Sequence, residues 1–280
     1  MKNKICVITG VTSGMGLATS IALAGMGATL ALVCRNKSKG EAVVKTITGQ
    51  TKNNNITLFV ADLSSQAEIR MLAAQLNEKY PHIDVLVNNA GAINKDYILT
   101  VDGIETTFAV NHLAYFLLTN LLLEKLKAAP KARIINFASM ASMFGKINFV
   151  DLNLEKGYSS WKAYSQSKLA NIIFTYELAK KLENSNVTAN CLHPGVVKTR
   201  FGKELKGFFG FVFKKMEFFM RTAEKGAETA IWLASSAEVE GITGKYFQDK
   251  KAIKSKNVSY NAEVQHKLWE VSEKLTNLNS

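Results

Sequence analysis

Tyr164 and Lys168 are the two residues whose types and spacing best suit catalysis. They stand four positions apart in the stretch Tyr-Ser-Gln-Ser-Lys, so on a helix they would share one face. An ammonium group beside a phenol favours the phenolate, and lowering a phenol pKa from about 10 by about 3 units requires about 4 kcal/mol. The pair therefore predicts a tyrosine that exchanges protons near neutral pH.

A glycine-rich turn near the amino terminus suits the binding of a dinucleotide. Gly10, Gly14 and Gly16 follow an apolar run and precede a helical pattern. Without side chains, the turn lets amide N–H groups and a helix N-terminus approach a pyrophosphate. A tight turn without a ligand is the alternative, and the preceding strand-like run favours the cofactor. We expect the contacts to come from Gly10, Thr12, Ser13, Gly14, Met15 and Gly16.

The end of the second apolar run bears on the choice of dinucleotide. An acidic residue there would accept hydrogen bonds from the ribose 2′-hydroxyl of NAD. The sequence has Cys34-Arg35-Asn36-Lys37 instead, so no carboxylate is available. Arg35 could pair bidentately with a 2′-phosphate, with Asn36 beside it. A solvated basic turn is the alternative. The pattern favours NADP(H) over NAD.

Short apolar runs alternate with helical patterns, which is typical of βαβ units and a parallel sheet covered by helices on both faces. The predicted strands are Ile5–Thr9, Ala28–Cys34, Ile56–Ala61, Val85–Val87, Arg133–Ala138, Val187–Leu192 and Gly244–Phe247. The predicted helices lie near 15–25, 38–49, 65–79, 102–127, 162–184 and 223–235. No linker or repeat interrupts the pattern, so we predict one α/β domain with a doubly wound parallel sheet.

Composition limits the classes of function. The chain is 47% apolar and 21% charged, as expected for a globular protein with a large core. Its formal charge of +12 favours phosphates or acidic lipid surfaces, but dispersed lysines and arginines without a reading motif argue against nucleic acid. Three cysteines in apolar runs and four histidines without ligand spacing predict neither disulfides nor a metal site. No apolar run is long enough to span a bilayer, and we expect a cytoplasmic protein.

Taken together, these motifs resemble the short-chain dehydrogenase/reductase family from about residue 3 to about residue 275. The matching features are the Thr9–Gly16 turn, Asp62-Leu63, Asn88-Asn89-Ala90-Gly91, Asn111, Ser139, Tyr164 with Lys168, and Pro194-Gly195. Within the family the chain is most similar to the retinol dehydrogenase-like reductases, in the stretches Val33–Asn36, Tyr164–Asn171, His193–Thr199 and Leu268–Ser272. The resemblance implies a Rossmann-type fold, with a cofactor half over about 1–140 and a catalytic and substrate half over about 141–280.

The resemblance also implies roles for particular residues. Tyr164 would be the general acid in carbonyl reduction or the base in the reverse direction, and Lys168 would lower its pKa and hold the nicotinamide ribose. Ser139 would donate to the substrate oxygen, and Asn111 would position a water in a proton relay. The remaining cofactor contacts would be Asp62 and Leu63 at the adenine, Asn89, Ala90 and Gly91 along the cleft, and Pro194, Val197 and Thr199 at the nicotinamide.

Residues 201–219 contain seven of the fifteen phenylalanines, mixed with four lysines. By resemblance this segment belongs to a substrate lid over about 200–221, and an apolar lid implies a lipophilic substrate. Aromatic residues with flanking lysines would also suit a peripheral membrane contact, and a homo-oligomer interface is the third interpretation. The three can overlap.

We predict an NADP(H)-dependent oxidoreductase that reduces an apolar aldehyde or ketone, with Tyr164 as the proton donor. One alternative is NADP-linked oxidation of retinol or a hydroxysteroid, with an apolar alcohol as substrate. Another is a non-catalytic NADP-binding regulatory module. Loss of Tyr164 or Lys168 would have favoured that module, and both residues are present.

Overall fold

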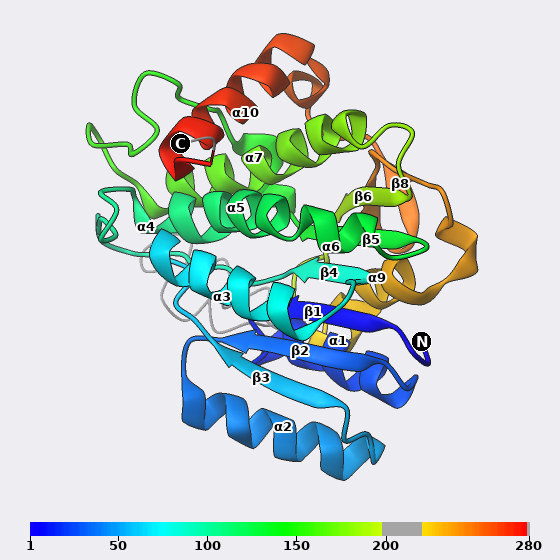
Figure 1. Cartoon of the computed structure of the whole chain (residues 1–280). Helices are drawn as coiled ribbons and strands as arrows, with labels where there is room; N and C mark the ends of the chain where they lie inside the picture. The colour runs from blue at the N-terminus through cyan, green and yellow to red at the C-terminus, as the bar shows by residue number, and fades with distance from the viewer. Residues whose placement is uncertain (198–219, 279–280) are drawn as a thin grey trace.

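One mostly parallel sheet forms the centre of the protein (Figure 1). A computed structural model describes residues 1–197 and 220–278 of the 280. The strands run in the spatial order β3-β2-β1-β4-β5-β6-β7-β8, and β8 alone among them is antiparallel to its neighbour. Their bounds are β1 Ile5–Thr9, β2 Thr29–Cys34, β3 Ile56–Val60, β4 Val85–Asn88, β5 Ala132–Phe137, β6 Val187–Leu192, β7 Tyr246–Gln248 and β8 Lys251–Ile253.

Helices cover both faces of this sheet, as Figure 1 shows. One face is covered by α1 Gly14–Gly25, α2 Lys37–Thr51 and α9 Ala223–Ser235, and α1 packs against both of the others. The other face carries α3 Gln66–Lys79, α5 Ala114–Leu121 and α7 Ser160–Lys181, with α10 Ala262–Thr276 packed outside α7. Three shorter elements join these layers: α4 Thr106–Phe108, α6 Leu123–Lys127 and the 3₁₀ turn η2 Met140–Phe144.

The alternation of side chains along β1 shows why both faces are apolar. Val7 belongs to the core cluster under α3, α5 and α7, whereas Cys6 and Ile8 belong to the cluster under α1, α2 and α9. All three are fully buried. A strand whose two faces are both buried must be apolar at every position, and this produced the continuous runs in the sequence. The prediction of a single doubly wound α/β domain is confirmed.

The strand order reverses between β1 and β4, because β2 and β3 lie on one side of β1 and the later strands lie on the other. In open parallel sheets, ligands bind beyond the carboxyl ends of the strands at such a reversal. The residues that directly follow β1, β4, β5 and β6 are therefore the ones the fold brings together for a site.

Three elements differ from the sequence predictions, and one of them is the edge strand β8, which was not predicted. The single helix predicted over 102–127 starts at Thr106, contains a π-helical turn, η1 Ala109–Leu113, and is interrupted at Leu122. The helix begins late because the Glu105 carboxylate accepts the main-chain N–H groups of Thr107 and Phe108. The third difference is α10, which was not predicted because charged residues obscure its apolar positions. None of the helices in the described residues is long and apolar enough to cross a bilayer.

Candidate active site

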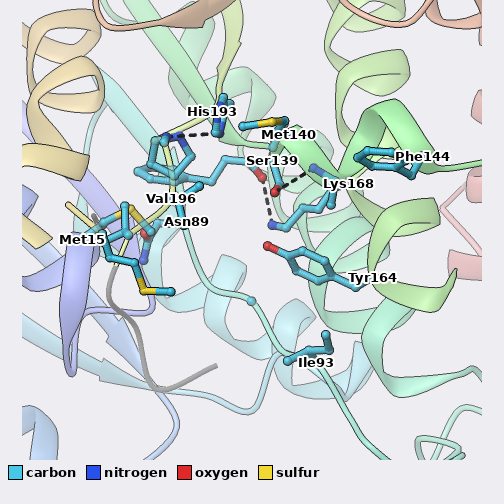
Figure 2. Close-up of a pocket in the computed structure, with 18 of the residues that line it drawn as sticks. Met15, Asn89, Ile93, Ser139, Met140, Phe144, Tyr164, Lys168, His193 and Val196 are labelled. Carbon is cyan, nitrogen blue, oxygen red and sulfur yellow. Dashed lines mark hydrogen bonds between the residues drawn. The ribbon is translucent and has the colours of Figure 1, made fainter. Parts of the chain in front are cut away.

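A cavity of about 260 Å³ lies at the reversal of the strand order (Figure 2). The sequence-predicted residues that line it are Met15, Asn89, Gly91, Ser139, Tyr164, Lys168, Pro194 and Val197. They come from the turn after β1, the segments after β4, β5 and β6, and the helix α7. The fold therefore brings the predicted cofactor turn and the predicted catalytic residues to one place.

The glycine turn after β1 is packed too closely to carry side chains. A Cβ atom on Gly16 would lie 2.3 Å from the Gly10 oxygen, and one on Gly10 would lie 2.7 Å from the Ala90 Cα. Asn89 braces the turn, because its Nδ2 donates to the carbonyl oxygens of Thr9, at 2.8 Å, and Gly10, at 3.0 Å. Ala90 belongs to the same support, since its N–H donates to Thr9 Oγ1.

The N-terminus of α1 is suited to an anion. The Ser13 side chain makes no capping hydrogen bond, and the first turn of the helix has no acidic residue. Gly14 has a φ of +60°, and the space where its Cβ would stand is open, as is typical of a bare turn that faces a ligand. Free N–H groups and the helix dipole favour negative charge at this point. The turn therefore fits the pyrophosphate of a dinucleotide.

Arg35 stands at the carboxyl end of β2, with its side chain 78% exposed. Its Nη1 lies 3.7 Å from Asp62 Oδ2, so the guanidinium is near a carboxylate without being enclosed by it. This arrangement leaves the guanidinium accessible to a 2′-phosphate. Asn36 has a structural task, since its side chain accepts from the Lys39 N–H and caps α2. Leu63 is buried in the core cluster under α3.

Ser139, Tyr164 and Lys168 surround one side of the cavity (Figure 2). Ser139 follows the end of β5, and its hydroxyl accepts the Ala141 N–H at 3.2 Å. Tyr164 and Lys168 lie one turn apart on α7, and Nζ is 5.7 Å from the centre of the phenol ring. The predicted spacing on one helix face is what the structure shows.

Burial has a large effect on Lys168. The residue is only 4% exposed, and Nζ donates to the Phe137 carbonyl oxygen at 3.0 Å. No carboxylate in the described part of the chain forms an ion pair with it. Burial without a counter-charge disfavours the ammonium, and it lowers the pKa of Lys168 to about 7.

The predicted lowering of the Tyr164 pKa was wrong. Burial raises the pKa of Tyr164 above its ordinary value, and a hydrogen bond with Ser139 acts in the opposite direction without cancelling it. The reason is that burial disfavours the charged phenolate more than the hydrogen bond with Ser139 favours it. At neutral pH, Tyr164 is a phenol that holds its proton.

Asn111 lies behind the cavity and does not line it. It sits in the π-helical turn η1, is fully buried, and exchanges two hydrogen bonds with the main chain of Ala92. Its Nδ2 also donates to Ser167 Oγ at 3.0 Å. A Cβ on Gly91 would stand 3.3 Å from Asn111 Oδ1 and 3.7 Å from Lys168 Nζ, so both side chains pack close to Gly91. The role of Asn111 in a water relay remains a prediction.

The sequence analysis missed several apolar residues of the cavity wall. They are Ile93, Met140, Phe144, Trp161, Val196 and Met220. Met140 and Phe144 lie on η2, the turn that begins directly after Ser139, and this proximity in the sequence could have identified them. Thr199 and the phenylalanine-rich residues 201–219 lie outside the described residues, so the lid, the membrane contact and the subunit interface stay predictions.

Comparison with known proteins agrees with this architecture. Residues 4–207 match the family model for short chain dehydrogenases. The chain belongs to the short-chain dehydrogenase/reductase family and is an oxidoreductase of its retinol dehydrogenase-like branch. It is 39% identical to retinol dehydrogenase 14 from Homo sapiens across an alignment that covers 99% of this chain and 88% of the relative.

Two solved structures show the same fold. An uncharacterized protein from Mycobacterium paratuberculosis has a TM-score of 0.80 and 33% sequence identity, covering 99% of this chain and 94% of that one. A short-chain dehydrogenase from Shigella flexneri 2a, complexed with NADP, has a TM-score of 0.73 and 22% identity, covering 90% of this chain and 98% of that one.

Proposed function

We propose that the protein is an NADP(H)-dependent reductase of apolar aldehydes or ketones. The observation that carries the proposal is the cavity, in which the Tyr164 and Ser139 hydroxyls and the Lys168 ammonium stand among mainly apolar side chains. Such a lining binds an apolar substrate by contact area and orients it with few polar groups. A screen of NADPH consumption against aldehydes and ketones of graded chain length tests it.

The choice of NADP(H) is supported by the glycine turn and by Arg35. The turn and the uncapped N-terminus of α1 would hold the pyrophosphate, and Arg35 would pair with the 2′-phosphate. The NADP complex of the similar Shigella protein supports the same choice. When bound, the reduced cofactor supplies the hydride.

The side chains of the cavity handle the substrate oxygen and its proton. Ser139 and Tyr164 would donate hydrogen bonds to a carbonyl oxygen and stabilise the negative charge that develops on it. Tyr164 would then transfer its proton to that oxygen, and its raised pKa ensures that the proton is present at neutral pH. The Lys168 ammonium, 5.7 Å from the ring, would stabilise the phenolate that is left.

A second candidate is the oxidation of an apolar alcohol such as retinol or a hydroxysteroid. The names of the relatives favour it, since the similar human protein is a retinol dehydrogenase. Oxidation requires Tyr164 as a base, and its raised pKa places that form at alkaline pH. We therefore expect oxidation to be fastest at alkaline pH, whereas reduction uses the protonated phenol that is present near neutrality. We also propose that the protein is cytoplasmic, with a peripheral membrane contact as one of the three interpretations of residues 201–219.

Substrate chain length should control the catalytic efficiency. Each methylene buried in the cavity contributes about 0.8 kcal/mol, so kcat/KM should rise about fourfold per methylene until the cavity is filled. Phe144→Ala should flatten this dependence, because Phe144 lines the cavity. Val150→Ala is the matched control, since that apolar side chain is exposed like Phe144 but does not line the cavity. Equal efficiency for short and long aldehydes would contradict an apolar substrate.

The proposal also predicts a pH dependence. The pKa of Lys168 is about 7, so its positive charge is present below this pH and is lost above it. Because NADPH is a polyanion, kcat/KM for NADPH should be highest on the acid side and fall by up to about tenfold per pH unit beyond the midpoint. Lys168→Met should be less active and should show no such midpoint. A wild-type profile that is flat through pH 7 would count against the assignment.

A further inference from the structure

The carbonyl oxygen of Phe137, at the end of β5, accepts two buried donors. One is Lys168 Nζ at 3.0 Å, and the other is Asn171 Nδ2 at 3.1 Å. Both donors come from α7, about one turn apart. A carbonyl oxygen has two lone pairs, so these donors fill its capacity. The oxygen that holds the lysine of the site is therefore itself held by Asn171.

The orientation of the Asn171 amide is fixed by a histidine. His112 Nδ1 lies 3.4 Å from Asn171 Oδ1, and His112 Nε2 lies 2.9 Å from Ser272 Oγ of α10. An amide oxygen can only accept, so the neutral ring must carry its proton on Nδ1 to satisfy it. Nε2 is then an acceptor that lies 2.9 Å from the Ser272 hydroxyl, whose single proton is shared between Nε2 and the Leu268 carbonyl oxygen at 2.7 Å. A series of polar contacts therefore runs from α10 through His112 and Asn171 to the Phe137 carbonyl.

Apolar side chains enclose the hydrogen-bonded series of His112, Asn171 and Ser272, which keeps the imidazole neutral. His112, Asn171 and Ser272 are all fully buried. The imidazole lies between aromatic rings, with ring centres 5.1 Å away at Phe108 and 6.1 Å away at Phe174. Burial lowers the pKa of His112 to about 4, so the ring stays neutral around physiological pH. The series of His112, Asn171 and Ser272 therefore acts as a fixed support for the Phe137 carbonyl.

We propose that Asn171 is a positioning residue for the reaction, acting through the Phe137 carbonyl on Lys168, and that His112 and Ser272 fix its amide. The inference rests on the proposed function, in which the Lys168 ammonium supports Tyr164. Displacement of a catalytic group by about 1 Å can cost about 100-fold in rate, so the support of the ammonium matters. The aromatic groups that face Nζ are Tyr164 and Tyr115, each with its ring centre 5.7 Å away.

Two variants at one position separate positioning from general stability. Asn171→Leu removes the donor at similar volume, and we expect kcat/KM to fall about tenfold with little change in the affinity for NADPH. Asn171→Asp adds a carboxylate. Because Nδ2 and Nζ share one oxygen atom, they are no more than about 6 Å apart, a range in which an opposite charge favours the ammonium. The midpoint of the pH profile should therefore move up by about one unit or more.

Asn190→Leu is the matched control, because Asn190 is also a buried asparagine that donates to a main-chain carbonyl, that of Ile242, and it does not line the cavity. It should leave the pH profile unchanged. Ser272→Ala, a milder change, should reproduce part of the loss in kcat/KM, whereas Thr276→Val should not, since that hydroxyl bonds only within α10.

The wild-type protein distinguishes failure of this inference from failure of the proposed function. If wild type does not oxidise NADPH with any apolar carbonyl, the proposed function fails, and the pH midpoint of NADPH binding, followed by fluorescence, still reports on Lys168. The positioning role is supported if Asn171→Asp moves that midpoint upward. It is overturned if both Asn171 variants keep the wild-type profile, or if Asn190→Leu causes the same change.

Discussion

Tyr164→Phe is expected to lower kcat for carbonyl reduction by about 10²–10⁴-fold, which is the usual contribution of a general acid. The substitution keeps the ring that packs beside Lys168 and removes only the hydroxyl that carries the proton. The Ser139 hydroxyl remains as a hydrogen-bond donor but cannot replace Tyr164, because an aliphatic hydroxyl is a much weaker acid than a phenol. The affinity for NADPH should change little. Steady-state kinetics together with a fluorescence titration of NADPH separates the two effects.

Tyr80→Phe provides the matched control for this experiment. Tyr80 is also buried, but it follows α3, leads toward the amino end of β4 and does not line the cavity. Its variant should retain wild-type turnover. Retention of more than about a tenth of the activity by Tyr164→Phe would exclude Tyr164 as the proton donor, because the loss would fall below the range for general acid catalysis.

Arg35→Ala is expected to weaken the binding of NADPH by about 10–100-fold and to leave the binding of NADH nearly unchanged. Only NADPH carries the 2′-phosphate, and a lost charge-assisted hydrogen bond is worth about 1.5–3 kcal/mol. Exposure of the guanidinium places the effect toward the lower end of this range, since solvent and salt screen the pair. Dissociation constants for both cofactors, measured at one ionic strength, give the ratio directly.

Two further variants make the test of Arg35 specific. Lys39→Ala removes an exposed positive charge four residues further along, and it should not change the ratio between the cofactors. Arg35→Lys should fall between wild type and Arg35→Ala, because a lysine cannot form the bidentate pair. Equal weakening of NADPH and NADH, or a wild-type preference for NADH, would refute the assignment of the 2′-phosphate to Arg35.

The parallel strands could be predicted from the sequence because burial on both faces makes them continuously apolar. The bounds of β1 and β6 agree with the prediction at both ends. The helix α10 was less visible, since only a spacing of apolar residues at Val264, Leu268, Val271 and Leu275 marks it among charged neighbours. The π-helical turn η1 depends on the buried partners of Asn111 and His112, which no local pattern specifies.

Ser139, Tyr164 and Lys168 line one cavity because their order in the chain follows the strand ends of the fold, whereas the predicted Asn111 does not line it. Their electrostatics could not be predicted in the same way. The depth of burial that raises the pKa of Tyr164 and lowers that of Lys168 is a property of the folded packing. The support of Lys168 by Asn171, His112 and Ser272 joins three helical segments far apart in the sequence, so it could be found only in the structure.

The most direct test of the account is the transfer of deuterium to a long-chain aldehyde from NADPH that carries deuterium at both C4 positions of its nicotinamide ring. Mass spectrometry of the alcohol product measures that transfer. We predict one deuterium per alcohol with the wild-type protein, and product formation about 10²–10⁴-fold slower with Tyr164→Phe. Absence of labelled alcohol across a series of apolar aldehydes and ketones, with NADPH shown to be bound, would contradict the proposed reduction.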